Sequence, residues 1–260
     1  MVGWCVRVVL LATLLGVPLR HGGSAMDGPA MAADQGRLDV RPAAIPAPSP
    51  SATAPAGERP IGLGGQRDGL VHVPPSVPID RPAPLVVMLH GAGGAARGTV
   101  ELIKSQADAA GVVLLVPESR GRTWDVILGG YGPDVRFLAD ALRKLLSEQA
   151  IDPRRIAVAG FSDGASYALS LGLTNGDLFS HILAFAPGFM APASLHGRPA
   201  IYVSHGTEDG VLPIEVCSRR LVPALQRAGY PVRYHEFPGG HAVPPDIAQE
   251  GVDMFLAGRS

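Results

Sequence analysis

Cysteine, charge and metal-binding patterns are all scarce in this chain of 260 residues. Its two cysteines are Cys5 and Cys217, and an exported protein that loses Cys5 with a leader has no internal disulfide. Charged residues make up 17% of the chain and the formal net charge is -1, so there is neither a basic surface for nucleic acid nor an acidic tail. The eight histidines lack the His-x-x-x-His spacing that is typical of a metal site. The composition is globular, 47% hydrophobic, and the core must supply the stability.

The N-terminal segment has an apolar run, residues 8–17, that is too short to span a bilayer comfortably. Arg7 precedes the run and the small residue Ala25 follows it, which is the pattern of a secretory signal peptide over residues 1–25. We therefore expect an exported chain, secreted or periplasmic, with no stable membrane span after cleavage. The alternatives are an uncleaved leader that anchors the chain in a membrane and a misassigned start codon.

Residues 26–60 are rich in Pro, Ala, Ser and Gly and show no apolar periodicity. Such a segment cannot bury enough apolar surface to offset the entropy lost on ordering, so we predict a disordered or polyproline-like linker. The rest of the chain, residues 61–260, is long enough to form one domain with a sizeable core.

Short apolar runs alternate with longer amphipathic ones through the predicted domain. The short runs, several of them β-branched and bounded by Gly or Pro, predict strands at 69–73, 85–90, 112–116, 156–160, 182–186, 200–204 and 232–237. The longer segments predict helices at 99–110, 133–149, 164–173, 214–228 and 245–256. Apolar strands separated by helices imply a mostly parallel sheet with helices on both faces, so the predicted fold class is α/β.

Chemically reactive side chains follow several of the predicted strands, where α/β sheets bind their ligands. One of them, Ser162, lies in the sequence Gly-Phe-Ser-Asp-Gly between a predicted strand and a predicted helix. Small flanking residues allow a strained turn that exposes the serine oxygen, and the helix that follows favours developing negative charge. Ser162 is therefore a candidate nucleophile, and the alternative is a serine that only occupies a tight turn.

A serine hydroxyl needs a general base, and the base needs an acidic partner that fixes its tautomer. Downstream, the segment SHGTEDGVLP offers Asp209, with Glu208 as a reserve, because the residues after Asp209 suggest a tight turn. The segment FPGGHAVPPD offers His241, which lies in a loop and is free to reach the serine. His235 lies within a predicted strand and is expected to be a half-buried strand residue.

An oxyanion requires backbone N–H donors near the nucleophile. We predict one donor from Asp163, directly after Ser162, and one from Ala92 in the loop HGAGGAARG, with Gly93 as a reserve. This glycine-rich loop lacks both the Gly-x-Gly-x-x-Gly spacing and the Gly-Lys-Ser/Thr ending of nucleotide-binding loops, which argues against a nucleotide site.

Other conspicuous residues receive structural interpretations. His90 and His205 precede glycines at strand ends and are expected to form hydrogen bonds within loops, and Cys217 is expected to pack in the core. Trp124 follows the third predicted strand and is expected to line the pocket and contact substrate. Nearby, Arg120 and Asp125 form either a structural ion pair or a substrate contact.

Four segments in this order, LHGAGG, GFSDGASYALSLGL, SHGTEDGVLP and GGHAVPPDI, resemble the α/β-hydrolase superfamily. The resemblance is greatest to its phospholipase/carboxylesterase branch, with polyhydroxybutyrate depolymerase-like and feruloyl esterase-like relatives. It implies Ser162 as nucleophile, Asp209 as acid, His241 as base, and no cofactor. Many members of this branch have glutamine where this chain has Asp163, a departure that places a negative charge near the site. No insertion is long enough for a lid, so we expect a compact domain with an open site.

The expected activity is hydrolysis of a small-molecule or lipid-like carboxylic ester through an acyl-enzyme intermediate. One alternative is a thioesterase or peptidase that uses the same three residues. Another is an inactive exported binding domain that keeps the fold.

Overall fold

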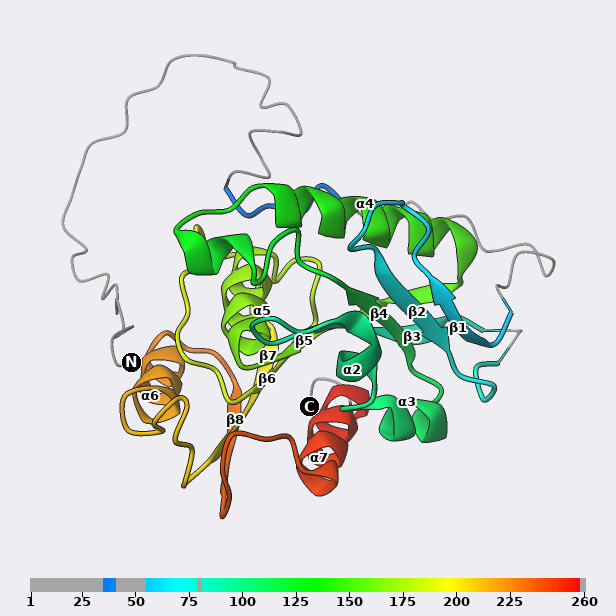
Figure 1. Ribbon diagram of the computed structural model, residues 1–260. Helices are drawn as coiled ribbons and strands as arrows, with labels where there is room; N and C mark the ends of the chain where they lie inside the picture. Colours follow the sequence, from blue (N-terminus) through cyan, green and yellow to red (C-terminus); the bar gives the residue numbers. More distant parts are fainter. Residues whose placement is uncertain (1–34, 41–54, 79–80, 258–260) are drawn as a thin grey trace, which may run out of the picture.

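Strands whose residues are buried on both faces form the centre of the molecule, as the continuous apolar runs require. The computed structural model describes residues 35–40, 55–78 and 81–257, and its sheet has eight strands in the order β1-β2-β4-β3-β5-β6-β7-β8 (Figure 1). Strand β2 pairs antiparallel with β1 and β4, and the pairings from β4 to β8 are parallel. This confirms the predicted α/β class.

The strands have the following bounds: β1 Gly57–Pro60, β2 Gly69–Val73, β3 Ala83–Leu89, β4 Val113–Pro117, β5 Ile151–Phe161, β6 His181–Phe185, β7 Ala200–Gly206 and β8 Val232–Phe237. The helices are α2 Ala96–Val100, α3 Lys104–Ala110, α4 Pro133–Glu148, α5 Asp163–Thr174, α6 Ser218–Arg227, α7 Pro245–Leu256 and the short 3-10 helix η2 Asp125–Leu128.

Two apolar cores form the layers above and below the sheet. One core joins α4, α5 and α6 to one face, and the other joins α2, α3 and α7 to the opposite face (Figure 1). Because β3, β5, β6, β7 and β8 pair in parallel, the carboxyl ends of β3, β5, β7 and β8 all lie at one rim of the sheet. The segments after these four strands carry the predicted nucleophile, acid, base and oxyanion donors, and the predicted substrate contact Trp124 follows β4.

The helix predicted at residues 99–110 is instead two short helices, α2 and α3. Ile103 lies between them with φ -136 and ψ 5, which breaks the helical backbone, while its side chain is fully buried against the sheet. Burial of this side chain therefore outweighs the helical preference of the surrounding sequence and interrupts the helix at Ile103.

The ordered domain begins earlier than residue 61. Gly57–Pro60 of the predicted linker forms the edge strand β1, paired with β2. Further upstream, Leu38 and Val40 are buried in the core that contains α4, and the side chain of Asn175 binds Leu38 N and Gly36 O. These contacts contradict a disordered linker over residues 35–40 and 57–60, because buried apolar side chains and backbone pairing offset the ordering entropy there.

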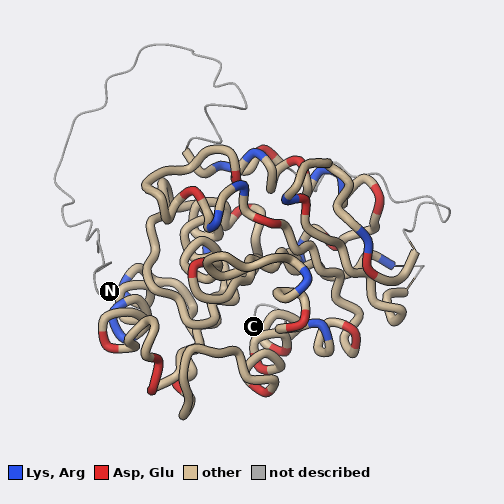
Figure 2. The backbone as a smooth tube through the Cα atoms, in the orientation of Figure 1, with Lys and Arg blue, Asp and Glu red and all other residues tan. Residues whose placement is uncertain are grey.

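The predicted signal peptide, residues 1–25, and the linker segments 26–34 and 41–54 lie outside the described residues. Among the residues that are described, no helix has the length and apolar character needed to cross a membrane. Basic and acidic residues are interspersed along the backbone rather than segregated by sign (Figure 2).

Candidate active site

Ser162 occupies a sharp turn between β5 and α5. Its φ of 58 and ψ of -122 are strained for a residue with a side chain, and its N–H is held by Phe185 O at 3.0 Å. The flanking glycines are required by close main-chain contacts. A Cβ on Gly160 would lie 2.2 Å from Gly164 O, and a Cβ on Gly164 would lie 2.3 Å from Leu89 O. The Gly-x-Ser-x-Gly pattern is thus a steric requirement of this turn.

His241 and Asp209 approach Ser162 from the loops after the last two strands. His241 Nε2 lies 2.9 Å from Ser162 Oγ, and its Nδ1 lies 2.6 Å from Asp209 Oδ2. Because the Asp209 carboxylate only accepts hydrogen bonds, Nδ1 carries the proton and Nε2 is free to accept the Ser162 hydroxyl. The structure thus joins the three predicted residues in one chain of hydrogen bonds.

Asp209 is held rigidly and stays ionised. Its Oδ1 accepts the N–H groups of Val211 and Leu212, both at 2.8 Å, and its side chain has no exposed surface. Burial acts to raise the pKa of Asp209, but these backbone hydrogen bonds and the one from His241 outweigh it, so that the pKa is lowered overall. Glu208, the reserve candidate, is exposed and does not take this place.

Two backbone N–H groups next to the nucleophile have no hydrogen-bond partner among the described residues, those of Ala92 and Asp163. Gly93, the reserve donor, is excluded because its N–H donates to Arg122 O at 2.7 Å. The loop lies against the nucleophile, since a Cβ on Gly91 would be 3.3 Å from Ser162 Cβ.

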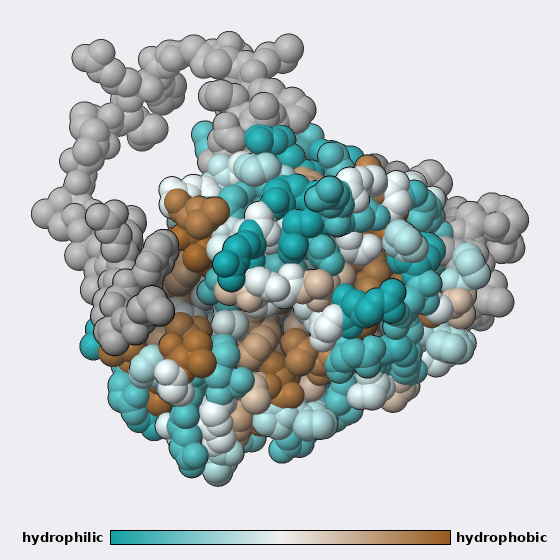
Figure 3. Space-filling view, viewed as in Figure 1, coloured by the Kyte–Doolittle hydropathy of each residue, from teal (hydrophilic) through white to brown (hydrophobic). Residues whose placement is uncertain are grey.

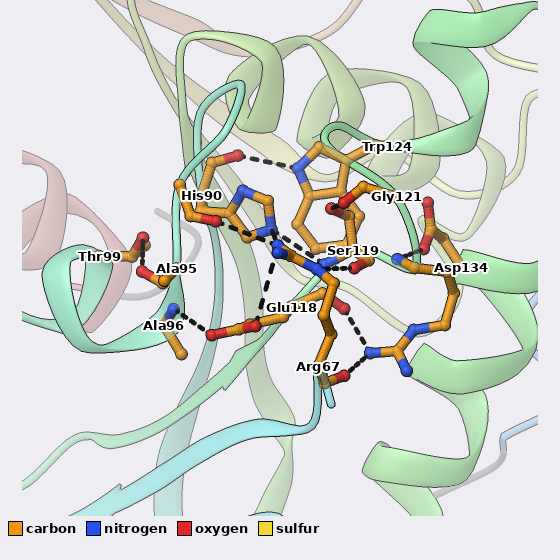
Figure 4. A network of polar contacts seen from close by, with 12 residues as sticks. Arg67, His90, Ala95, Ala96, Thr99, Glu118, Ser119, Gly121, Trp124 and Asp134 are labelled. Carbon is orange, nitrogen blue, oxygen red and sulfur yellow. Dashed lines mark hydrogen bonds and ion pairs between the residues drawn. The ribbon is translucent and has the colours of Figure 1, made fainter. Parts of the chain in front are cut away.

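His90 determines how this loop presents its peptide groups. Its Nε2 accepts the Ser119 N–H at 2.9 Å (Figure 4). Its Nδ1 therefore carries the proton and donates to Gly91 O at 2.7 Å. The C=O and N–H of a trans peptide point in opposite directions, so a Gly91 carbonyl turned to His90 turns the Ala92 N–H away from it. Burial lowers the pKa of His90, which keeps this tautomer neutral. Its predicted role in loop hydrogen bonding agrees with this geometry.

Arg67, which the sequence analysis did not single out, joins the two loops that carry this network (Figure 4). Its Nε donates to Ser119 O and a second nitrogen donates to Gly94 O at 3.1 Å. Glu118 completes the connection, since it lies 3.8 Å from the Arg67 guanidinium and accepts the Ala96 N–H at 3.0 Å. No sequence motif marks this arginine; its position in the loop between the edge strands β1 and β2 brings it here.

The prediction that Trp124 contacts substrate is wrong for this structure. Its side chain is 0% exposed, stacks on Tyr167 with ring centroids 5.0 Å apart, and donates its indole N–H to His90 O at 2.8 Å. A residue that follows a strand end can either line the site or pack in the core beneath the loops that form the site. Trp124 is a support of the His90 loop.

Arg120 and Asp125 do not pair with each other. The Arg120 guanidinium lies 3.6 Å from the centroid of the Phe137 ring and donates to Glu118 O. Asp125 binds the backbone N–H groups of Gly132 and Asp134 through Oδ2. Both residues therefore shape the loop that precedes α4.

The remaining histidines and the thiol have structural surroundings. His235 is hydrogen-bonded to Glu250, as befits a strand residue, and Cys217 is buried. Burial, with the negative charge of Asp209 next in effect, raises the pKa of Cys217 to about 11. His205 is fully buried with its Nε2 3.2 Å from Asp209 Oδ2. Within the described residues, no three His, Cys, Asp or Glu side chains are grouped to hold a metal ion.

The chain is similar in sequence to known esterases and thioesterases. Residues 135–256 match the family described as phospholipase/carboxylesterase. The chain is 28% identical over 205 residues to "Putative esterase NocK" of Nocardia uniformis subsp. tsuyamanensis, covering 69% of this chain and 60% of that protein. It is 31% identical over 127 residues to acyl-protein thioesterase 1 of Gibberella zeae, covering 43% and 52%. The chain thus spans between half and two thirds of the length of these curated relatives.

Among solved structures, esterase PE8 superimposes with a TM-score of 0.61 at 23% identity, covering 74% of this chain and 99% of that one. A phospholipase/carboxylesterase of Dyadobacter fermentans gives a TM-score of 0.54 at 23% identity, covering 75% and 100%. At these identities the likeness shows the fold. The chain thus has the α/β-hydrolase fold of these esterases, and its residues 135–256 are similar to the phospholipase/carboxylesterase family.

Proposed function

We propose that this protein hydrolyses carboxylic esters by acyl transfer through Ser162. The observation that carries the proposal is the unbroken chain from Asp209 Oδ2 to His241 Nδ1 at 2.6 Å and from His241 Nε2 to Ser162 Oγ at 2.9 Å. The three side chains are 79 and 32 residues apart in sequence, and a structural role alone does not require all three to meet at a strained turn.

In the acylation step, Ser162 Oγ attacks the ester carbonyl carbon while its proton passes to His241 Nε2. Asp209 stabilises the imidazolium that forms, and it remains ionised because its pKa lies below the usual range. The tetrahedral intermediate then collapses: the ester C–O bond breaks, His241 gives its proton to the leaving alkoxide, and an acyl-Ser162 ester remains.

In the deacylation step, His241 removes a proton from water as the water oxygen attacks the acyl carbon. Collapse of this second intermediate breaks the bond to Ser162 Oγ, which regains its proton from His241. The products are a carboxylic acid and the regenerated hydroxyl.

Negative charge on the substrate oxygen would be held by the N–H groups of Ala92 and Asp163. Both are free of protein partners in the described structure, and both belong to backbone that is fixed before substrate binds. Removal of one such donor in other enzymes costs about 10²–10³ in kcat.

An uncharged ester fits the negative charge next to the nucleophile. The Asp163 carboxylate is next to the nucleophile and accepts a hydrogen bond from Thr123 Oγ1 at 2.6 Å, so it places negative charge at the site. Apolar patches lie on the left and lower centre of the face shown in Figure 3, with hollowed surface between them. Exposed apolar side chains of the domain include Leu128 and Val211.

A thioester is the second candidate substrate. One matching relative is named acyl-protein thioesterase 1, and thioester cleavage needs the same nucleophile, base and oxyanion donors. A panel of p-nitrophenyl esters of short and long acyl chains, feruloyl esters, acyl thioesters and peptide anilides separates these chemistries.

The nucleophile is tested with Ser162→Ala and, as a matched control, Ser105→Ala at an exposed position in α3. We expect the first to lower turnover about 10⁶-fold and the second to leave it unchanged. A loss below tenfold with the fold intact would overturn the assignment. Labelling of Ser162 by a fluorophosphonate probe also separates an enzyme from an inactive binding domain.

We propose further that the protein is exported and that residues 1–25 are removed. The proposal rests on the short apolar run and Ala25 in the sequence. N-terminal sequencing of protein from the culture medium or periplasm tests it, and recovery of the full-length chain in the cytosol alone contradicts it.

A further inference from the structure

His205 is a second imidazole next to the Asp209 carboxylate. It is the sixth residue of β7, its side chain has no exposed surface, and its Nε2 lies 3.2 Å from Asp209 Oδ2. The same carboxylate oxygen lies 2.6 Å from His241 Nδ1. One oxygen of Asp209 is therefore placed between two imidazole rings.

The neighbours of His205 determine its tautomer. Nε2 faces only acceptors, Leu212 O at 2.8 Å and Asp209 Oδ2, so it must carry the proton. Nδ1 lies 2.6 Å from Ser218 Oγ, whose hydroxyl donates to it. Ser218, the first residue of α6, is fully buried and thereby holds the proton on the Asp209 side of the ring.

The ring is uncharged in this arrangement. Burial lowers the pKa of His205, and this effect exceeds the opposing effects of the Leu212 carbonyl and Asp209. A neutral N–H next to the carboxylate orients it without neutralising the negative charge that the His241 imidazolium requires.

Resting on the proposed function, we infer that His205 is a positioning residue: its Nε2–H, shared between Leu212 O and Asp209 Oδ2, holds the carboxylate oxygen that binds His241 Nδ1. Leu212 makes the arrangement reciprocal, because its C=O accepts from His205 and its N–H donates to Asp209 Oδ1 at 2.8 Å. Without His205, Asp209 Oδ1 keeps its two backbone donors. Leu212 O and Asp209 Oδ2, however, both lose the His205 Nε2–H between them.

The expected consequence is misplacement of the base in the transition state rather than loss of substrate binding. Small displacements of a catalytic group cost up to about 10²-fold in rate. His205→Leu should lower kcat about 100-fold and change KM by less than about threefold. His205→Gln, whose amide N–H can reach the same acceptors, should recover kcat to within about tenfold of the wild type.

The matched controls are His235→Leu and His235→Gln. His235 lies on the adjacent strand β8, paired in register with Ser204, and is also hydrogen-bonded to a carboxylate, that of Glu250. Its variants remove the same atoms from an imidazole that is hydrogen-bonded to Glu250 rather than to Asp209, so kcat should stay within about twofold of the wild type. Circular dichroism and thermal unfolding accompany each variant.

A spectroscopic readout makes the test independent of turnover. A short imidazole–carboxylate hydrogen bond gives a downfield proton resonance, here expected from His241 Nδ1–H, and it should weaken or move upfield in His205→Leu but not in His235→Leu. If His205→Leu fails to fold, Ser218→Ala, which frees the tautomer, should lower kcat about threefold to tenfold and move the same resonance.

Two failures are distinguishable. Wild-type kcat and an unmoved resonance in His205→Leu would overturn the positioning role while leaving ester hydrolysis intact. A wild-type protein that cleaves no ester or thioester overturns the proposed function, and the resonance then decides alone whether His205 orients the Asp209–His241 pair.

Discussion

Replacing Asp209 by asparagine keeps the size of the side chain but replaces one hydrogen-bond acceptor, a carboxylate oxygen, by a donor, the amide NH2. The Oδ1 position faces two backbone N–H donors at 2.8 Å, so the amide oxygen of the introduced asparagine must take that place. The amide NH2 then occupies the Oδ2 position, where it faces His241 Nδ1. Two donors cannot share this contact, so the imidazole moves its proton to Nε2 and presents Nε2–H to Ser162 Oγ.

The magnitude follows from the tautomer. An Nε2–H imidazole cannot take the proton of Ser162, and the corresponding substitution in another serine hydrolase lowers kcat about 10⁴-fold. That factor is about 5.5 kcal/mol in the activation free energy, at 1.36 kcal/mol for each tenfold. Substrate contacts are not altered, so KM should change by less than about threefold.

The assay is steady-state hydrolysis of the best p-nitrophenyl ester from pH 5 to 9, with Glu208→Gln as the matched control at the exposed neighbouring residue. Activity in the Asp209→Asn variant should rise with pH as hydroxide replaces the lost base. A loss below tenfold at neutral pH, with wild-type thermal unfolding, would refute the assignment of Asp209 as the acid. An equal loss in the Glu208→Gln control would show that a substitution in this turn lowers activity whether or not it removes the acid.

Three further substitutions test other parts of the structure. Gly164→Ala places a Cβ 2.3 Å from Leu89 O and should cost about 1–3 kcal/mol of unfolding free energy; an unchanged urea midpoint contradicts the close approach. Asn175→Ala removes the buried side chain that binds residues 36 and 38 and should cost about 2–3 kcal/mol by urea unfolding, whereas no change would mean that this segment is not docked. Burial raises the pKa of Asp134 to about 6, so ionising it disfavours the folded state as pH rises from about 4 to about 6. The unfolding free energy of the wild type relative to Asp134→Asn should fall by up to roughly 3 kcal/mol over that range, and a constant difference contradicts the shift.

Much of the sheet could be predicted because its strands are apolar on both faces. The apolar run at 69–73 matches β2, and the helix at 245–256 matches α7. The run at 232–237 also matches β8, although that strand is only partly buried. The break at Ile103 could not be predicted, because the helical pattern continues through it and only the sheet below determines which side chain is buried. Likewise, the docking of residues 35–40 depends on Asn175, more than a hundred residues away.

Ser162, Asp209 and His241 could be chosen from the sequence because each follows an apolar run and their residue types form a known chemical set. Trp124 was placed wrongly, because a strand end does not reveal whether a side chain faces the site or the core, whereas the predicted loop hydrogen bond of His205 is present at Leu212 O. A histidine four residues before the acid was the available signal for His205. Its meaning depends on the turn at residues 209–212, which folds the carboxylate back toward the strand.

The close packing of the main chains in the loops after β7 and β8, more than the side chains of Asp209 and His241, fixes the distance between the acid and the base. Thr207 N donates to Phe237 O and Glu208 N donates to Gly239 O, so the loops after β7 and β8 are joined before either functional side chain begins. A Cβ on Gly206 would lie 2.3 Å from the carbonyl oxygens of both residue 239 and residue 240. Only glycine permits this contact, which lets a short aspartate reach His241. Gly206 is visible in the sequence, but its contact with the carbonyl oxygens of residues 239 and 240 can be identified only once β7 and β8 are known to be neighbours.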